Sequence, residues 1–464
     1  MKPFAGRKGC LLPERELAPL SLSPGRRLAL LAAVAVIASS TFAMAQAGQL
    51  DSSFGARGVF TTNFTQADST MANGAAIQSD GKIVVVGSTP GGDALARLNT
   101  NGTLDSSFGS GGIVNTNFGT LGPVVAVVIQ PDGKIVAAAT GFLGGAVGRF
   151  NSDGSVDTTF GNGGFAVSKS LDSQPGIPSA LALQADGKIL VTGADLIGRY
   201  TSEGQLDTTF GSSGIAALNS AIATAIALQS DGKILVTTGS GAPTELFSSQ
   251  YLPSPQAGAI ARYNTNGSLD TNFGISGQAA CVASAAAIAI QSNGKIVVAG
   301  TITSKLITLL LSDGVTVADN QTGFGLVRYN SNGSVDTTFN PGGGIGTGGG
   351  IITGFGSSFP AGSAFALAIQ SNGEIVVAGQ AGNGNQQFTS SSFVLARYTT
   401  TGHLDTTFGS NGTVITTLSQ GPISFVSALV LQSDGKIVAA GNTGTGGQQG
   451  SYVDNFAVAR YLAQ

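Results

Sequence analysis

The sequence predicts an all-β fold: a seven-bladed β-propeller of four-stranded antiparallel blades, closed by pairing of its N- and C-terminal strands. Three observations lead to this prediction. Three short motifs recur seven times in a fixed order, each repeat carries two hairpin signals, and the composition suits short strands. Gly accounts for 70 of the 464 residues, and only 10% of residues are charged. Such a chain favours short strands joined by Gly-rich turns, and its 42% hydrophobic content can form a large core.

Residues 1–45 have the pattern of a signal peptide. Arg26 and Arg27 precede an apolar stretch, Leu28–Ala38, that is too short to span a bilayer. Ala43-Met44-Ala45 has the A-x-A form of a cleavage site. We therefore expect a signal peptide over 1–45, a propeller over 46–464, and export to the periplasm or the cell exterior. No later segment predicts a membrane span.

The charge balance of the remaining chain bears on its partners. Without residues 1–45 the chain has 16 Lys and Arg against 23 Asp and Glu, a net charge of −7. Nucleic-acid binding requires a basic surface, so this balance argues against a nucleic-acid partner. One cysteine remains, Cys281, so no intrachain disulfide is expected.

Three motifs define the repeat, which is about 59 residues long and thus exceeds the ~40–50 of WD40 or kelch blades. The first motif is L/V-D-[ST]-x-F, the second is Q-x-[DN]-G-[KE]-[IL], and the third is an apolar stretch that ends in Arg. The second motif predicts a hairpin, because β-prone runs flank Asp-Gly or Asn-Gly, the typical dipeptides of a two-residue turn. Ala recurs in the strand before this turn, which suits the crowded strand nearest the propeller axis.

The third motif and the first motif that follows it predict a second hairpin. Arg and Asp are eight residues apart in all six internal copies, a spacing that fits a three-residue loop with a left-handed Gly. Arg and Asp would then lie side by side on adjacent strands, where an opposite-charge pair contributes about 0.2–1 kcal/mol. The expected pairs are Arg97 with Asp105, Arg149 with Asp157, Arg199 with Asp207, Arg262 with Asp270, Arg328 with Asp336, Arg397 with Asp405, and Arg460 with Asp51.

Two hairpins make a four-stranded blade, and seven blades close a ring. The chain opens with an Asp segment, Leu50–Phe54, and ends with an Arg strand, Phe456–Tyr461. Each supplies what the other lacks, so the N-terminal strand should complete the last blade and place Asp51 beside Arg460. A parallel β-helix is the rival architecture, but its rungs are usually shorter and lack two antiparallel turn signals per repeat.

The motifs LDTTFG, IQSNGKIVVAG and ARYN together resemble the delta-sixty repeat family of exported bacterial proteins. The resemblance covers the whole chain after residue 45. It implies a β-propeller and export, and it brings no catalytic residues. Departures from the pattern are Asn293 and Asn372 in place of the turn Asp, Glu374 in place of Lys, and Asn340 in place of the Gly after the motif Phe.

Few residues outside the repeats could carry chemistry. The single His, His403, occupies a turn position, and Cys281 lies in an apolar strand, so neither a Ser-His-Asp triad nor a His/Cys zinc site is expected. NSDGSVD at 151–157 spaces oxygen side chains as calcium loops do, yet turn chemistry explains all seven copies. We expect no catalytic residue and no cofactor, with calcium the alternative.

Function is therefore open between three readings. The first is a secreted or cell-surface binding or scaffold protein for an unknown protein or glycan ligand. The second is an exported metal-dependent hydrolase resembling a lactonase, and the third is a structural component of the envelope. We expect a monomer. An inserted hairpin over 306–319, LITLLLSDGVTVAD, should project from repeat five, and the alternative is that it folds down as a lid over the channel.

The two fixed turns should lie on one face of the ring and the connections of variable length on the other. The longest connections fall in repeats four to seven, and binding residues gather on such loops. The ligand contacts expected there are Phe247, Tyr251, Asp313, Phe355, Phe359 and Tyr452.

Overall fold

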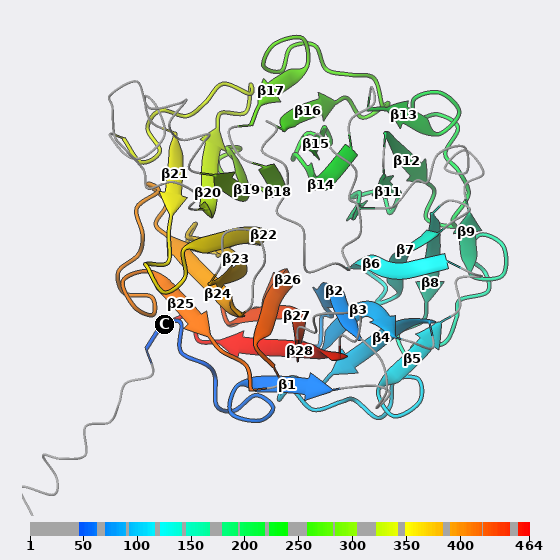
Figure 1. Ribbon diagram of the computed structural model, residues 1–464. Coiled ribbons are helices and arrows are strands. Elements are labelled where there is room, and N and C mark those ends of the chain that lie inside the picture. Colours follow the sequence, from blue (N-terminus) through cyan, green and yellow to red (C-terminus); the bar gives the residue numbers. More distant parts are fainter. Residues whose placement is uncertain are drawn as a thin grey trace, which may run out of the picture. The chain divides into compact units, whose positions relative to one another are not determined.

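A computed structural model describes residues 46–62, 70–89, 92–116, 121–141, 145–167, 179–193, 195–218, 222–239, 258–281, 284–303, 322–341, 349–383, 390–419, 421–445 and 453–464. The compact unit formed by Gln46–Gln464 contains seven antiparallel sheets of four strands each, arranged in a ring (Figure 1). The prediction of a seven-bladed propeller is confirmed.

In each blade, the strand before the Gln motif lies innermost, and the strand after it is second (Figure 1). The inner strands are β2 (Met71–Ile77), β6 (Leu121–Ile129), β10 (Ala180–Leu183), β14 (Ile222–Leu228), β18 (Ser284–Ile290), β22 (Ala361–Ile369) and β26 (Ile423–Leu431). The second strands are β3 (Ile83–Thr89), β7 (Ile135–Gly141), β11 (Ile189–Thr192), β15 (Ile234–Gly239), β19 (Ile296–Thr303), β23 (Ile375–Gly382) and β27 (Ile437–Thr445).

The third strand of each blade carries the motif Arg, and the fourth lies on the rim. The third strands are β4 (Gly92–Leu98), β8 (Ala146–Phe150), β12 (Leu196–Tyr200), β16 (Ala259–Tyr263), β20 (Thr322–Tyr329), β24 (Ser391–Tyr398) and β28 (Val453–Tyr461). The outer strands are β5 (Ile113–Thr116), β9 (Phe165–Val167), β13 (Ile215–Ala217), β17 (Gln278–Ala280), β21 (Gly350–Thr353), β25 (Thr413–Thr416) and β1 (Val59–Thr62). Blade 1 is β2–β5, the following blades continue in chain order, and blade 7 is β26, β27, β28 and β1.

Ring closure follows the prediction. β1 pairs with β28 in antiparallel register, with Val59 opposite Ala459 and Thr62 opposite Phe456. The N-terminal segment thus supplies the outer strand of the blade whose other strands come from the C-terminus. Closure leaves no blade with an uncovered third strand, which removes an edge that could pair with another chain.

The core lies between blades. Valine, isoleucine and alanine of the second and third strands are buried and pack in clusters that each join two neighbouring blades. One such cluster combines Val84, Val86 and Leu95 of blade 1 with Ile135 and Ala137 of blade 2. Strands covered on both faces are rich in apolar residues at every position, as seen here.

Two details of the predicted hairpins are wrong. The Asp-Gly turn is not a two-residue turn, because Gln78 N donates to Lys82 O at 2.9 Å and Gly81 N donates to Gln78 O at 2.9 Å. This is a three-residue loop in which only Gly81 has positive φ, at 82°. The Asp80 carboxylate accepts the Lys82 amide at 3.0 Å and fixes this shape. The second turn has the three-residue form that was predicted, with Gly102 at φ 81°.

The L-D-[ST]-x-F motif does not itself form the outer strand. Leu104 makes only an isolated bridge to Leu98, and β5 begins eight residues after Asp105, at Ile113. The Asp105 side chain accepts hydrogen bonds from Ser107 N at 3.1 Å and Ser107 Oγ at 2.7 Å, which bends the chain away from the sheet. The bend places Phe108 in the core before the strand starts.

Candidate functional site

The repeated polar network centres on the motif Arg and Asp. In blade 1, Arg97 ends the third strand, and the backbone bond from Asp105 N to Arg97 O, 2.9 Å long, brings the two residues opposite each other. Arg97 Nε then donates to Asp105 Oδ2 at 2.8 Å, and both side chains are buried. The structure brings together all seven expected pairs, which are Arg97–Asp105, Arg149–Asp157, Arg199–Asp207, Arg262–Asp270, Arg328–Asp336, Arg397–Asp405 and Arg460–Asp51.

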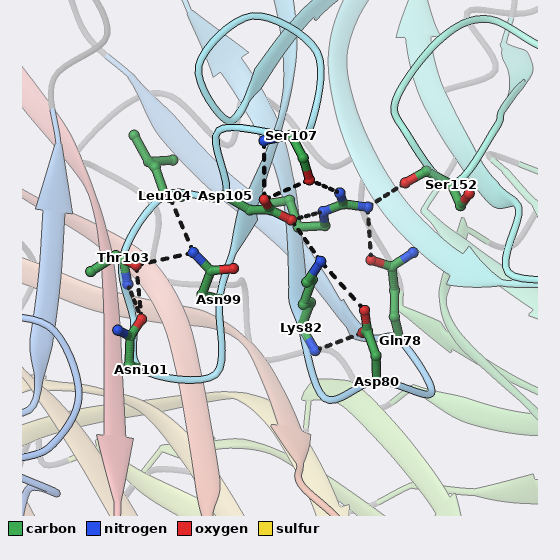
Figure 2. Close-up of polar contacts among 11 residues, drawn as sticks. Gln78, Asp80, Lys82, Asn99, Asn101, Thr103, Leu104, Asp105, Ser107 and Ser152 are labelled. Carbon is green, nitrogen blue, oxygen red and sulfur yellow. Dashed lines mark hydrogen bonds and ion pairs between the residues drawn. The ribbon is translucent and has the colours of Figure 1, made fainter.

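Figure 2 shows this network in blade 1. Besides Arg97 and Ser107, the Asp105 carboxylate contacts Lys82, whose Nζ lies 3.0 Å from Oδ2. Burial alone would raise the pKa of the Asp105 carboxyl. The hydrogen bonds from Ser107 and Lys82 and the charge of Arg97 outweigh burial and hold that pKa well below its usual value. The carboxylate therefore stays ionised at neutral pH and cannot serve as a general acid.

The motif Phe supports the same Arg from below. The Arg97 guanidinium carbon lies 4.6 Å from the centre of the buried Phe108 ring, a cation–π arrangement. The same stacking occurs in every blade, on Phe54, Phe108, Phe160, Phe210, Phe273, Phe339 and Phe408. Sequence reasoning missed this role, although the presence of Phe three residues after the Asp in all seven repeats was the available signal.

Each Arg also reaches the next blade. Arg149 Nη1 donates to the Ser202 carbonyl at 2.6 Å, and Arg97 makes the equivalent bond to Ser152. A second bond runs in parallel, since Gly109 N donates to Asp153 O at 2.9 Å. These acceptors belong to the turn between the motif Arg and the motif Asp of the following blade. The network therefore joins blades around the ring, and a residue set repeated in every blade is structural rather than catalytic.

In two places a further carboxylate contacts a motif Arg. In blade 6, Glu374 takes the place of Lys and lies 3.3 Å from Arg397, which therefore contacts two carboxylates. In blade 3, the turn residue Glu203 extends to Arg149 of blade 2 at 3.2 Å. Both carboxylates are paired with an arginine, so neither is placed as a free acid or base.

The strands around the axis offer no titratable side chain where they are described. The inner strands consist of small and apolar residues with a few Ser, Thr, Asn and Gly, for example SAAAIAI in β18. Within the described ranges, no three His, Cys, Asp or Glu side chains come together as a metal site would require. A lactonase-like centre needs carboxylates that converge on the channel, so these strands lend that reading no support.

The remaining chemically capable residues have structural surroundings. Cys281 is buried, and burial raises the pKa of its thiol to about 12. His403 lies in the turn of blade 6, where its amide donates to Thr399. In the loop considered for calcium, Asp153 Oδ1 accepts from Ser155 Oγ at 2.7 Å and Asn151 Nδ2 donates to Ser155 Oγ at 2.9 Å.

An open groove of about 710 Å³ runs beside β5, between blades 1 and 2. Its lining combines the apolar Ile113 and Val114 with small and polar residues that include Ser107, Ser110, Asn115, Asp153 and Ser155. Asp153 is the only carboxylate among its lining residues, and its Oδ1 is already held by Ser155. Among the described residues, the lining offers no second carboxylate for the pair of carboxyl groups that glycoside hydrolysis uses.

We call the face formed by the turns after the motif Gln and after the motif Arg the turn face. The face at the other ends of the strands is the loop face. Between the second and third strands, the chain runs through residues 90–91 from β3 to β4, through 240–258 from β15 to β16, and through 304–321 from β19 to β20. The predicted hairpin over 306–319 lies outside the described residues, as do four of the expected ligand contacts: Phe247, Tyr251, Asp313 and Tyr452.

The two described ligand candidates lie between β21 and β22, on the loop face. Phe355 packs edge-to-face against the buried Phe324, with ring centres 4.7 Å apart. Phe355 and Phe359 are each partly exposed and pack against the core shared by blades 5 and 6. Their inner surfaces thus contribute to stability, and their outer surfaces face solvent.

Comparison with solved structures finds chains of similar fold. A catalytically inactive variant of virginiamycin B lyase from Staphylococcus aureus, solved with quinupristin, has a TM-score of 0.50 at 13% identity, covering 87% of this chain and 99% of that one. A streptogramin B lyase gives 0.50 at 14% identity, over 87% and 97% of the chains. The extracellular domain of a putative hybrid two-component system from B. thetaiotaomicron gives 0.46 at 10% identity, over 87% and 41%. Identities this low show the fold alone.

Sequence comparison identifies the repeats. No curated protein has a significantly similar sequence. In the described part of the chain, no helix has the length and apolarity needed to cross a bilayer. The family described as "Domain of unknown function (DUF5122) beta-propeller" matches seven segments, 78–108, 130–160, 184–210, 248–273, 311–339, 370–408 and 432–463. These segments contain all seven motif Arg, six of the seven motif Asp and five of the seven motif Gln from which the delta-sixty resemblance was drawn. The chain therefore belongs to the DUF5122 β-propeller family.

Proposed function

We propose that this protein is an exported binding or scaffold propeller, which holds its loop face rigid for a protein or glycan ligand. The main support for this proposal is that its buried charged residues hold the blades together. The seven motif arginines and the seven motif aspartates are buried and joined in the ion-pair network, and each Arg links two blades. A scaffold needs such rigidity, whereas a catalytic centre needs a group that departs from the repeat.

The loop face of blades 4 to 6 is the proposed binding surface. The connections 240–258 and 304–321 are the longest between second and third strands. The connection from β21 to β22 carries the partly exposed Phe355 and Phe359. Variable loops on a rigid scaffold are where binding residues usually occur. Aromatic side chains suit both glycan and protein surfaces, because they bury a large apolar area.

Export is supported by the segment that precedes the propeller. The basic pair Arg26-Arg27, the apolar stretch Leu28–Ala38 and the A-x-A sequence at 43–45 form the order of a signal peptide. The compact unit begins at Gln46, the residue expected to follow cleavage. N-terminal sequencing of protein recovered from the periplasm and from the medium tests this part, and an intact residue 1 in a cytosolic fraction would contradict it.

The test of binding compares two variants of the propeller on an array of bacterial envelope polysaccharides and in pull-downs from envelope extracts. In the first variant, residues 304–321 are shortened to a Pro-Gly pair, as in 90–91. In the second, Asp80, Asp132 and Asp434 of the turn face are changed to Asn. We expect a ligand retained by the unmodified and turn-face proteins to be lost by the shortened one. If the shortened protein still retains the ligand at an unchanged melting temperature, the binding site lies elsewhere. A change in the mass of the bound glycan would indicate hydrolysis instead of binding.

A further inference from the structure

The outer strand of blade 7 differs from the other six in its covalent connections. In blades 1 to 6, the outer segment continues from the third strand through an unbroken three-residue turn. In blade 7, the outer segment Gln46–Thr62 comes from the opposite end of the described unit, and only noncovalent contacts join it to β28. It can therefore leave its place without a break in the chain.

The seventh turn is built from two pieces of chain. Gly48 N donates to Leu462 O at 2.8 Å, and Leu462 N donates to Gln49 O at 2.9 Å. These bonds reproduce those of Gly102 N to Asn99 O and Asn99 N to Thr103 O in blade 1. The carbonyls of Ala463 and Ala47 then take the bonds that one continuous turn accepts elsewhere, from Arg397 and Gly409.

The ion pair at this seam is formed less completely than its counterparts. In the other six blades the Arg Nε donates to the Asp Oδ2 at 2.6 to 2.9 Å. In blade 7, Arg460 Nη2 lies 2.9 Å from Asp51 Oδ2, but the buried Nε of Arg460 has no hydrogen-bond partner. The Arg–Asp pair of this blade thus forms an ion pair through Nη2 without the Nε hydrogen bond that the other six pairs have.

The acceptor surface beneath the segment is specific for its sequence. Phe54 is fully buried in a cluster with Ala96, Val438 and Val458 and lies 4.7 Å below the Arg460 guanidinium. Removal of the segment would open the edge of β28, uncover this pocket and leave the Arg460 side chain without its carboxylate. A segment that restores all three contacts needs an Asp for Arg460, a Phe three residues later for the pocket, and a following β-strand for the edge of β28.

We propose that Gln46–Thr62 of one copy binds the blade 7 acceptor surface of a second copy, so that the closing strand can be exchanged between molecules. The occupant is a second copy because that copy carries this segment, tethered to its ring on one side only. Exchange of an identical element is a low-cost route to association, since the bound contacts are those already present in the monomer. The monomer shown in Figure 1 is then the form favoured at low protein concentration.

Cysteine trapping tests the proposal directly. Arg460 N donates to Gly58 O, so Val59 and Ala459 form a non-hydrogen-bonded cross-strand pair, whose Cβ atoms lie close together. We prepare Val59→Cys and Ala459→Cys as separate full-length proteins with Cys10 and Cys281 changed to Ser, mix them and oxidise. The matched control partner is Ala396→Cys, the equivalent position in blade 6, which is covered by Thr413 of its own β25.

We expect a disulfide-linked heterodimer of the Val59→Cys and Ala459→Cys proteins that increases with protein concentration, and at least tenfold less with the Ala396→Cys protein. The double variant Val59→Cys/Ala459→Cys should crosslink within one chain, which confirms that both sites fold and react. Equal crosslinking to both partners, or no heterodimer where the double variant is fully oxidised, would overturn the proposal.

Peptide complementation gives a second measurement if a cysteine variant fails to fold. A synthetic peptide of residues 46–62 is added to the full-length Phe54→Ala protein, whose own segment cannot fill the pocket. We expect a saturable rise in melting temperature, and none with a peptide carrying Asp51→Asn and Phe54→Ala. An unchanged melting temperature with both peptides would exclude binding in trans.

Discussion

Arg262 Nη1 donates to the Ser331 carbonyl across the boundary between blades 4 and 5, at a distance of 2.5 Å. The same guanidinium donates from Nε to Asp270 within its own blade and stacks on Phe273. One side chain therefore fixes the turn of its blade and the position of the next. A Lys at this position would keep the charge but could not make these contacts together, because it lacks the planar group with several donors.

The first prediction concerns this arginine. Arg262→Lys should lower the free energy of unfolding by about 1.5–3 kcal/mol, since the hydrogen bonds to a buried charged partner are lost. Arg57→Lys is the matched control, because Arg57 is exposed and lies outside the repeated network. Urea unfolding of both variants measures the difference. Equal midpoints for the two proteins would mean that the network does not hold the blades.

The second prediction is a loss of stability in acid. Burial would raise the pKa of Asp207, but the hydrogen bonds from Thr209 and Lys188 and the Arg199 charge lower it to about 2. A pKa below the value of about 3.9 in the unfolded chain means that the unfolded state takes up protons first as the pH falls. The stabilisation is complete above about pH 5 and disappears between about pH 4 and 2.

Urea midpoints of the propeller at neutral pH and at several acidic pH values measure this effect. Asp207→Asn should be less stable than the unmodified protein at neutral pH and should lose less stability as the pH falls, because one titrating group is gone. Parallel curves for the two proteins would contradict the assignment.

The third prediction separates backbone strain from packing between blades. Gly154 and Gly133 both have positive φ, at 88° and 84°. A Cβ on Gly154 would lie 2.5 Å from Val114 and 2.9 Å from Phe108 of the preceding blade, whereas one on Gly133 would approach nothing closer than 4.0 Å. Gly133→Ala should cost about 1 kcal/mol for strain alone, and Gly154→Ala about 1–3 kcal/mol more for overpacking. Thermal unfolding compares them, and equal losses would show that the turn does not pack tightly on the neighbouring Phe.

The fourth prediction follows from the divided seventh turn. Joining Ala463 directly to Ala47 gives Leu462-Ala463-Ala47-Gly48-Gln49, the same length as Asn99–Thr103. With new ends opened in residues 240–257, this circular permutant should fold and should melt above a permutant that has a long Gly-Ser linker at the same junction. It should also give no strand-exchanged dimer. A lower melting temperature for the direct junction would show that the two pieces do not form one turn.

The sequence predicts the ring because its information is local and repeated. The spacing of eight residues from Arg to Asp is enough to place Arg97 opposite Asp105, since the loop between them has one geometry. The closure of β1 on β28 could be predicted because the first Asp segment has no Arg strand before it and the last Arg strand has no Asp segment after it. Two turn details escaped prediction because side chains decide them: the Asp80 and Asp105 carboxylates accept backbone amides and bend the chain where propensity alone suggested strand or a shorter turn.

The contacts between blades escaped prediction for another reason. Arg97 meets Ser152, a residue 55 positions away whose carbonyl carries no side-chain signal. The pairing of Glu374 with Arg397 likewise depends on three-dimensional proximity. In the other six repeats a Lys occupies the position of Glu374. The ligand surface is harder still, because loops that vary between repeats provide no internal copies for comparison.

The bond from each Arg to the following turn has a consequence for how the molecule unfolds. An open array of repeats has terminal units with one neighbour each, and these are the first to fray. Here blade 1 accepts a bond from Arg460 of blade 7, as every other blade does from the one before it, so each unit has two neighbours. No blade can then detach without the loss of two interfaces at once. Fluctuations should instead begin where the polypeptide is discontinuous, between Ala463 and Ala47, and hydrogen exchange should be fastest there among the backbone amides that complete the seven turns.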